Sequence, residues 1–205
     1  FAAINAGKFK DEIMPVEIPR RKGDPVVFEQ DECPRETSYE ILAKMPPAFQ
    51  KNGRATAGNA SIISDGAAAV VVMSREKATE LGCEVLATIG AQASAGLEMK
   101  YVLVAPILAI PKVLKKEGIS QDAVDLFEVN EAFSGSTVAV LRELDLDPAK
   151  VNVNGGSVAL GHPIGASGGR VLVTLLHEMI KQNKKTGLAS LCLGGGEAVA
   201  MILKR

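Results

Sequence analysis

The sequence predicts an α/β fold in which a mixed sheet carries helices on both faces, preceded by an irregular α+β segment. From residue 85 onward, short apolar runs rich in β-branched residues alternate with longer runs whose apolar residues recur at helical spacing. Near the C-terminus, the three glycines at 194–196 separate two apolar runs, which predicts a closing hairpin. Residues 8–60 lack this alternation and contain many prolines, so we expect little regular structure there.

Composition excludes several functional classes. The chain has 205 residues, of which 47% are hydrophobic and 23% charged, as in ordinary globular proteins. A formal net charge of -1 and the absence of Trp argue against nucleic acid or an anionic membrane as the main partner. The three cysteines, Cys33, Cys83 and Cys192, are too widely spaced for a disulfide framework or a metal site. We therefore expect a cytoplasmic protein without a bound metal.

The first third of the chain is expected to contain short elements. Residues 1–7 resemble the end of a helix with a glycine stop, so we expect the chain to begin inside a longer polypeptide. Alternating apolar residues predict short edge strands at 14–18 and 26–28, and residues 36–48 fit a helix. Such a segment covers a site, lies at an interface, or is a surface loop without a function of its own. Its composition fits all three roles equally well.

The later elements follow from apolar patterning. The small and β-branched residues at 67–73 predict a buried strand, and a helix over 74–82 follows it. A helix is expected over 106–116 because its apolar spacing is helical, although Pro111 opposes it. The remaining predicted strands are 85–89, 125–129, 151–153, 188–192 and 198–203, and the remaining predicted helices are 130–144 and 166–182.

One glycine-rich stretch, residues 155–170, organises the second half of the chain. It holds six glycines and His162, one of two histidines, and it leads into a predicted helix. Glycines permit tight turns and close approach to a ligand, and a helix start favours negative charge. The stretch is either a structural turn or a ligand-binding loop, and its spacing matches neither the dinucleotide nor the P-loop fingerprint.

Three candidate catalytic residues follow predicted strands or lie at loops before helices: Asn130, His162 and Cys192. Each has a plain alternative, since Asn130 fits a helix cap, Cys192 a small core residue, and a lone histidine a structural role. Together they suit thioester chemistry. A thiol titrates near neutral pH, an imidazole activates a second thiol, and a carboxamide orients water. The backbone N–H groups at Gly194 and Gly195 supply donors for an oxyanion.

Three ordered motifs resemble the C-terminal signatures of the thiolase family. They are Asn-Glu-Ala-Phe at 130–133, Gly-His-Pro at 161–163 within the glycine-rich stretch, and Cys-Leu-Gly-Gly-Gly at 192–196. Residues 56–61 and 65–69 also resemble the segment that comes before the family's N-terminal domain closes. The resemblance spans essentially the whole chain and is strongest to the biosynthetic branch of the family.

The resemblance implies a thiolase-like fold in three parts. Residues 1–63 would form part of the loop domain that covers coenzyme A, 64–84 the closing segment of the N-terminal domain, and 85–205 the C-terminal domain. It also implies a homodimer or homotetramer. The family's nucleophilic cysteine lies in a first half that this chain lacks, and neither Cys33 nor Cys83 has its setting.

The activity implied is acyl transfer: two acetyl-CoA molecules condense to acetoacetyl-CoA and CoA, or the reverse thiolysis occurs. Coenzyme A is then substrate or product, and no cofactor is expected. By motif match, His162 would activate the nucleophilic cysteine and Cys192 would transfer the methyl proton. Asn130 would hold an oxyanion-site water, and the Gly194 N–H would serve the second oxyanion site. The positions that would line the pantetheine arm are Ala60, Ser61, Ala132 and Phe133.

Three alternatives remain open from the sequence. A catabolic 3-ketoacyl-CoA thiolase acting on longer chains fits the same motifs. A non-catalytic acyl-CoA-binding module fits the missing nucleophile but does not need the acid–base residues. A dinucleotide-binding domain fits less well because the fingerprint spacing is absent.

Overall fold

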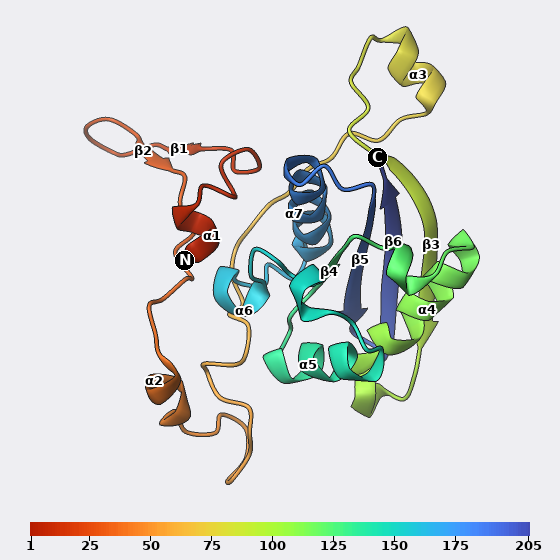
Figure 1. Ribbon diagram of the computed structural model, residues 1–205. Coiled ribbons are helices and arrows are strands. Elements are labelled where there is room, and N and C mark those ends of the chain that lie inside the picture. Colours follow the sequence, from red (N-terminus) through yellow and green to blue (C-terminus); the bar gives the residue numbers. More distant parts are fainter.

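A four-stranded mixed sheet forms the centre of the molecule in the computed structural model, which describes residues 1–205 (Figure 1). The strands lie in the order β3-β6-β5-β4, with β4 and β5 parallel and the other pairs antiparallel. Their bounds are β3 Thr88–Gly96, β4 Leu126–Val129, β5 Thr186–Leu193 and β6 Glu197–Lys204. The predicted mixed sheet and terminal hairpin are therefore confirmed.

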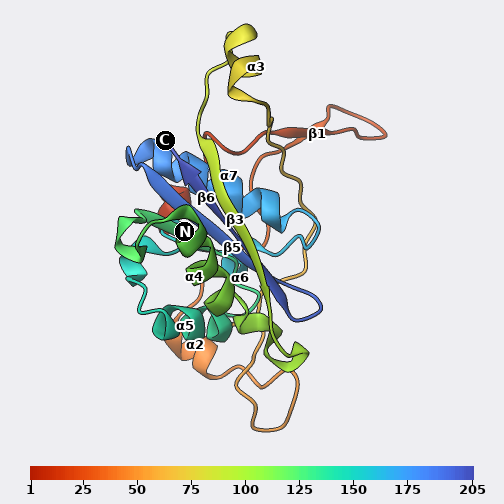
Figure 2. The ribbon, with the colours of Figure 1, turned by 90° about the vertical axis from the view of Figure 1, so that its right-hand side faces the viewer.

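Helices cover both faces of this sheet, as predicted. Helices α4 (Pro106–Glu117) and α5 (Ser134–Glu143) lie on one side and α7 (Ser167–Lys181) on the other (Figure 2). Consecutive strand residues point to opposite faces, so Leu188 packs in the α4 cluster and Ala189 in the α7 cluster.

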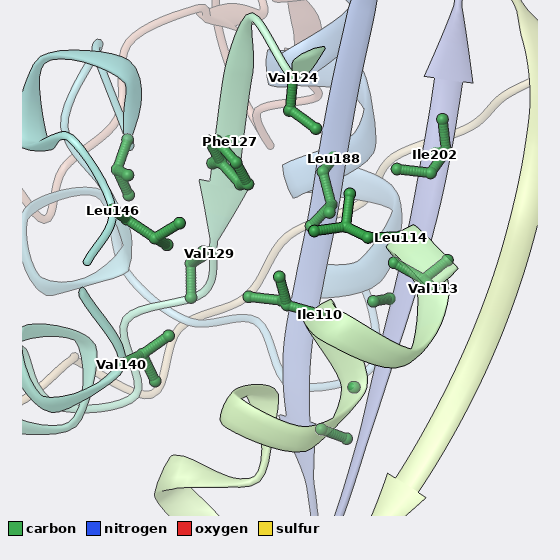
Figure 3. Close-up of a cluster of buried hydrophobic side chains, with 14 of the residues drawn as sticks. Ile110, Val113, Leu114, Val124, Phe127, Val129, Val140, Leu146, Leu188 and Ile202 are labelled. Atoms are coloured by element: carbon green, nitrogen blue, oxygen red, sulfur yellow. The ribbon is translucent and has the colours of Figure 1, made fainter. Parts of the chain in front are cut away.

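The larger core lies between α4, α5 and the sheet (Figure 3). Pro106 occupies the first turn of α4, where no N–H partner is lost, and Gly118 ends the helix with a left-handed φ of 75°. Ile110 and Val113 are fully buried one turn apart, while Pro111 faces solvent. The apolar stripe therefore outweighs the interior proline and holds α4 on the sheet.

The N-terminal residues run outside the sheet domain (Figure 1). Strands β1 (Val16–Ile18) and β2 (Val26–Phe28) pair antiparallel, which confirms the predicted edge strands. The helix predicted over 36–48 is shorter: α2 covers only Tyr39–Ala43, because Ser38 caps its start and prolines follow at 46 and 47. The other short elements are α1 Ala2–Asn5, α6 Ser157–Leu160, and the 3-10 turns Met99–Val104, Gln121–Ala123 and Pro148–Lys150.

The prediction of a buried strand at 67–73 is wrong. This run has no regular secondary structure, pairs with no strand, and is exposed, with Val71 at 86%. A strand needs a neighbour to satisfy its backbone, and the described sheet supplies none at this position. Helix α3 (Arg75–Glu80) follows it as predicted, with Ser74 as its cap.

Two further elements differ from the prediction because their backbone groups form hydrogen bonds with other partners. The helix predicted from 130 starts at Ser134, since Ala132 and Phe133 pair with residues 60–61 instead. The strand predicted at 151–153 is reduced to isolated bridges. The Asn152 side chain bonds both the N–H (2.7 Å) and the C=O (2.8 Å) of Val129, so a side chain replaces the ladder there.

The strand predicted at 85–89 instead covers 88–96. Its first residue, Thr88, pairs with Lys204 near the C-terminus of the chain, so residues 85–87 have no partner across the sheet. No helix combines the length and apolar character that crossing a membrane requires.

Candidate active site

The carboxyl ends of β4 and β5 hold three of the predicted site residues. Asn130 directly follows β4, Cys192 lies near the end of β5, and Gly194 opens the turn into β6. Because β4 and β5 are parallel, with Val129 paired to Ser190, these ends meet at one edge of the sheet. This is where ligands bind in α/β sheets.

The structure brings Asn130 and His162 into contact. The Asn130 Nδ2 lies 3.4 Å from the His162 Nε2, and Asn130 is only 4% exposed. The backbone of His162 is held as well, since its N–H donates to the Ile62 carbonyl at 2.7 Å. Two residues that sequence reasoning could only group by motif therefore share one site.

The contacts of His162 favour one neutral tautomer. Its Nδ1 lies 2.5 Å from the Ser167 Oγ, which also lies 3.0 Å from the Pro163 carbonyl oxygen. When the hydroxyl donates to that carbonyl, Nδ1 donates to the hydroxyl oxygen and Nε2 carries the lone pair. Burial, and secondarily the Arg170 charge, lower the pKa of His162, which favours the neutral ring.

Cys192 is half-buried, and this burial raises the pKa of its thiol. A higher pKa keeps the thiol protonated at neutral pH and makes its thiolate a stronger base. Gly194 lies in an exposed turn with open space around its α-carbon. The turn is closed by Gly195 and Gly196, whose φ values of 97° and 92° favour glycine.

The four positions expected to line the pantetheine arm lie side by side. Ser61 donates to the Ala132 carbonyl through both its N–H (3.1 Å) and its hydroxyl (2.9 Å), and Ala60 bridges to Phe133. Phe49, which sequence reasoning missed, packs edge-to-face on Phe133 with ring centroids 5.9 Å apart. Segments far apart in sequence thus form one surface beside Asn130.

Other residues missed from the sequence support the glycine-rich stretch. Glu131 accepts from the Val158 N–H at 3.3 Å and from the Asn152 side chain at 3.2 Å. A β-carbon on Gly156 would lie 2.5 Å from the Glu131 carboxyl carbon, which explains the glycine. The signal was present in the Asn-Glu-Ala-Phe motif, where the glutamate has no obvious partner until the chain folds.

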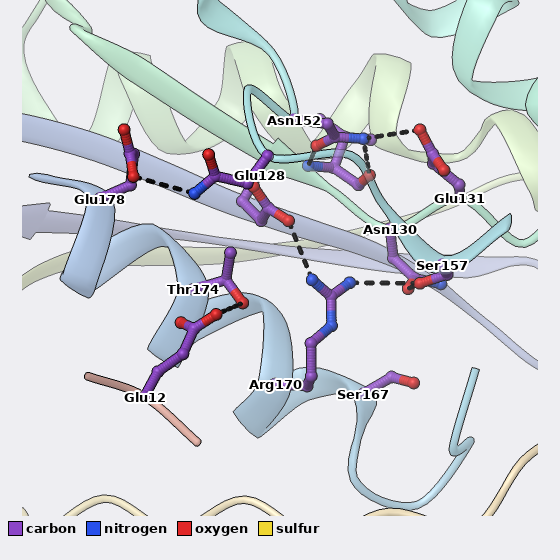
Figure 4. Close-up of polar contacts among 12 residues, drawn as sticks. Glu12, Glu128, Asn130, Glu131, Asn152, Ser157, Ser167, Arg170, Thr174 and Glu178 are labelled. Carbon is purple, nitrogen blue, oxygen red and sulfur yellow. Dashed lines mark hydrogen bonds and ion pairs between the residues drawn. The ribbon is translucent and has the colours of Figure 1, made fainter. Parts of the chain in front are cut away.

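Behind the site lies a polar network around Arg170 (Figure 4). The Arg170 guanidinium bonds the Glu128 carboxylate at 3.0 Å and the Ser157 hydroxyl at 3.2 Å, and Ser157 in turn donates to the Asn130 Oδ1 at 2.6 Å. Burial raises the pKa of Glu128 to about 7 in spite of Arg170. The sequence analysis assigned no role to Arg170, Glu128 or Ser157.

Cys33 lies next to the loop that carries His162, called the histidine loop below. A β-carbon on Gly161 would lie 3.0 Å from the Cys33 Sγ and 2.5 Å from the Ser64 Oγ. The structure contains no group of three or more His, Cys, Asp or Glu side chains placed to hold a metal ion.

Comparison with protein families assigns both parts of the chain. The model described as "Thiolase, C-terminal domain" matches residues 83–205, and "Thiolase, N-terminal domain" matches residues 1–76. The chain belongs to the thiolase family. The fold agrees, since a crystal structure of the Bacillus anthracis acetyl-CoA acetyltransferase superposes with a TM-score of 0.96 at 48% identity. That match covers 99% of this chain and 52% of the other.

Two other thiolase relatives are similar over the same extent. An acetyl-CoA acetyltransferase of Pseudomonas aeruginosa is 56% identical over 205 residues, which is 100% of this chain and 52% of the relative. Human mitochondrial 3-ketoacyl-CoA thiolase in complex with CoA has a TM-score of 0.90 at 41% identity, covering 99% and 50% of the two chains. This thiolase chain therefore spans about half the length of the relatives it matches.

Proposed function

We propose that this chain supplies the acid–base and oxyanion groups of an acetyl-CoA acetyltransferase. The enzyme condenses two acetyl-CoA molecules to acetoacetyl-CoA and CoA, or catalyses the reverse thiolysis. The observation that carries the proposal is the contact between Asn130 and His162 at the sheet edge that also holds Cys192. The name of the 56% identical relative supports acetyl transfer over longer acyl chains.

The geometry suits the proposed division of labour. The lone pair on the His162 Nε2 accepts the proton of a nucleophilic thiol, and the resulting imidazolium donates to the thioester oxygen. Asn130 orients a water toward the same oxygen. The Cys192 thiol gives its proton to the CoA thiolate that leaves when the nucleophilic cysteine is acetylated. The resulting Cys192 thiolate then takes a proton from the methyl group of the second acetyl-CoA during condensation, and both transfers run in reverse during thiolysis. The Gly194 N–H stabilises the second oxyanion.

Coenzyme A is proposed to bind as substrate along the surface formed by Ala60, Ser61, Ala132 and Phe133. These residues are small or apolar around a single hydroxyl, as expected for contact with a pantetheine chain. The CoA complex of a structure with a TM-score of 0.90 supports a CoA thioester as ligand.

The proposed partner is an N-terminal thiolase half that carries the nucleophilic cysteine. The relatives are about twice as long as this chain, and the exposed run at 67–73 lacks a neighbouring strand. In this proposal residues 1–63 belong to the loop domain, 64–84 complete the N-terminal domain, and 85–205 form the C-terminal domain. Assembly into a homodimer or homotetramer stays a prediction from the family resemblance.

Methyl-proton exchange tests the role of Cys192. The protein, assembled with an N-terminal thiolase half, is incubated with acetyl-CoA in D2O, and deuterium in the methyl group is followed by mass spectrometry. We expect Cys192→Ala to lower exchange at least about a hundredfold, the usual scale for a positioned acid–base group, while CoA binding persists. Cys83→Ala, at an exposed cysteine, is the control and leaves exchange unchanged. Equal exchange in both variants would favour the non-catalytic binding module.

A further inference from the structure

We propose that Arg170, acting through Ser157, is a positioning residue that sets the orientation of the Asn130 amide and the tautomer of His162. The inference rests on the proposed function for its kinetic consequence, but its structural claim concerns this chain alone.

A continuous series of hydrogen bonds joins Arg170, Ser157, Asn130 and His162. The Arg170 Nη2 lies 3.2 Å from the Ser157 Oγ, which lies 2.6 Å from the Asn130 Oδ1. The Asn130 Nδ2 then lies 3.4 Å from the His162 Nε2 (Figure 4 shows the contact between Arg170 and Ser157). The residues come from α7, α6, the end of β4 and the histidine loop, so folding alone brings them together.

The donors and acceptors in this series of hydrogen bonds have a fixed order, because the Arg170 guanidinium is only able to donate. Ser157 must accept from Arg170, so its own proton goes to the Asn130 Oδ1. The amide NH2 therefore faces His162, and since NH2 only donates, the His162 Nε2 must present its lone pair. The Ser167 hydroxyl adapts to either tautomer, because its proton can point to the Pro163 carbonyl or to Nδ1, so the Asn130 amide decides which tautomer forms.

Two features make this arrangement specific to arginine and serine. The Arg170 Nη1 bonds Glu128, which is 3% exposed, while Nη2 bonds Ser157, so the two-pronged guanidinium is needed and one ammonium cannot replace it. Ser157 is fully buried, so removal of its hydroxyl leaves the Asn130 Oδ1 without its donor. The amide is then free to flip and to present its oxygen to His162.

Kinetics of the assembled enzyme test the functional consequence. We expect Ser157→Ala to lower kcat about tenfold, the rate equivalent of one lost hydrogen bond, with KM changed less than about twofold. Arg170→Lys is expected to lower kcat similarly. Ser190→Ala is the matched control, because Ser190 is equally buried and its hydroxyl donates only to the Val199 carbonyl, at 2.8 Å. An equal fall in kcat for Ser157→Ala and Ser190→Ala would overturn the kinetic claim.

Nitrogen-15 NMR of histidine-labelled chain tests the structural claim without turnover. The chain has two histidines, so a His177→Gln variant assigns both rings. We expect one neutral tautomer of His162 with an unprotonated Nε2, and a mixture of tautomers in Ser157→Ala but not in Ser190→Ala. An unchanged His162 tautomer in Ser157→Ala would overturn the inference. If the tautomer shifts but no variant or wild type turns over, the proposed function fails and the positioning role stands.

Discussion

His162 is held at three separate points: its backbone N–H bonds Ile62, its Nδ1 bonds Ser167, and its Nε2 faces Asn130. A ring held this way changes neither position nor tautomer easily, which is what a base of fixed direction requires. Burial lowers its pKa, so the ring stays neutral at neutral pH and is able to accept a proton. The site therefore contains one oriented imidazole ring and the groups that orient it, as the proposed base role of His162 requires.

Gly161 places His162 through its unusual backbone. Its φ is 99°, and a β-carbon there would lie 2.5 Å from the Ser64 Oγ. We expect Gly161→Ala to lower the free energy of unfolding by about 1–3 kcal/mol, measured by urea denaturation. Gly165→Ala is the control, since a β-carbon there meets no atom within 4 Å and its φ is not positive. Equal stability of the two variants would contradict this account of the loop.

The sequence alone suggested the residues proposed to carry the chemistry but not the residues that contact them. Asn130, His162 and Cys192 stand in motifs whose order and spacing are distinctive. Ser157 and Arg170 have no such signature, because their role depends on two hydrogen bonds between residues that are distant in sequence. Arg170 and Ser157 are 13 residues apart, and Ser157 and Asn130 are 27 residues apart. Such contacts follow from the packing of α6 and α7 against β4, which patterning does not specify.

Among the elements, the link between β4 and α7 is polar as well as apolar. Leu126 of β4 packs with Val171 and Leu175 of α7, while Glu128 of the same strand bonds Arg170. The Glu128 carboxylate is buried with Arg170 as its cationic partner, and the charges of Glu131 and Glu12 also act on it, so its titration is coupled to the stability of this contact.

Glu128→Gln tests that coupling. The folded-state pKa of Glu128 is raised from 4.5 to about 7, so the folded protein binds this proton more tightly than the unfolded chain. Its contribution to stability is therefore fully present below pH 4.5 and is lost as the pH rises through 7. We expect wild type to lose roughly 1–3 kcal/mol relative to the glutamine variant between these limits.

The measurement is urea unfolding of both proteins at pH 5 and pH 7.5. Glu12, whose pKa burial also raises to about 7, is present in both proteins, and its charge contributes to the raised pKa of Glu128, so the difference between the two proteins reports Glu128 together with its coupling to Glu12. Parallel stability curves for wild type and variant would show that Glu128 does not titrate in this range.

The predictions of helices and strands were correct where the local apolar pattern agrees with the observed burial. They were wrong where a strand forms only if a neighbouring strand is available to pair with it. The helix predicted over 106–116 is present as α4 because its apolar stripe faces the sheet. The run at 67–73 has the composition of a strand but no neighbour, and at 151–153 the Asn152 side chain replaces the strand ladder. Propensity is local, whereas pairing is a property of the whole fold.

On the scale of the molecule, the sheet domain is well packed on its α4 face and less closed on the other. Beside α7, a cavity of about 610 Å³ is lined by residues that include Val70, Leu172, Leu191 and Met201. Val70, which lines this cavity, is the first residue of an exposed apolar run at 70–73. Together with the match to about half the length of its relatives, this is consistent with the proposed assembly with an N-terminal thiolase half.

Thiolysis of acetoacetyl-CoA, measured with this chain alone and with a separately supplied N-terminal thiolase half, tests whether the chain needs a nucleophile from outside. We expect no CoA-dependent cleavage by the chain alone, cleavage on addition of the N-terminal half, and loss of that cleavage in Cys192→Ser. A Cys33→Ser variant that retains full activity in the assembled form would fit a nucleophile outside this chain. Turnover by the chain alone that disappears in Cys33→Ser would contradict the account, because the chain would then hold its own acyl acceptor.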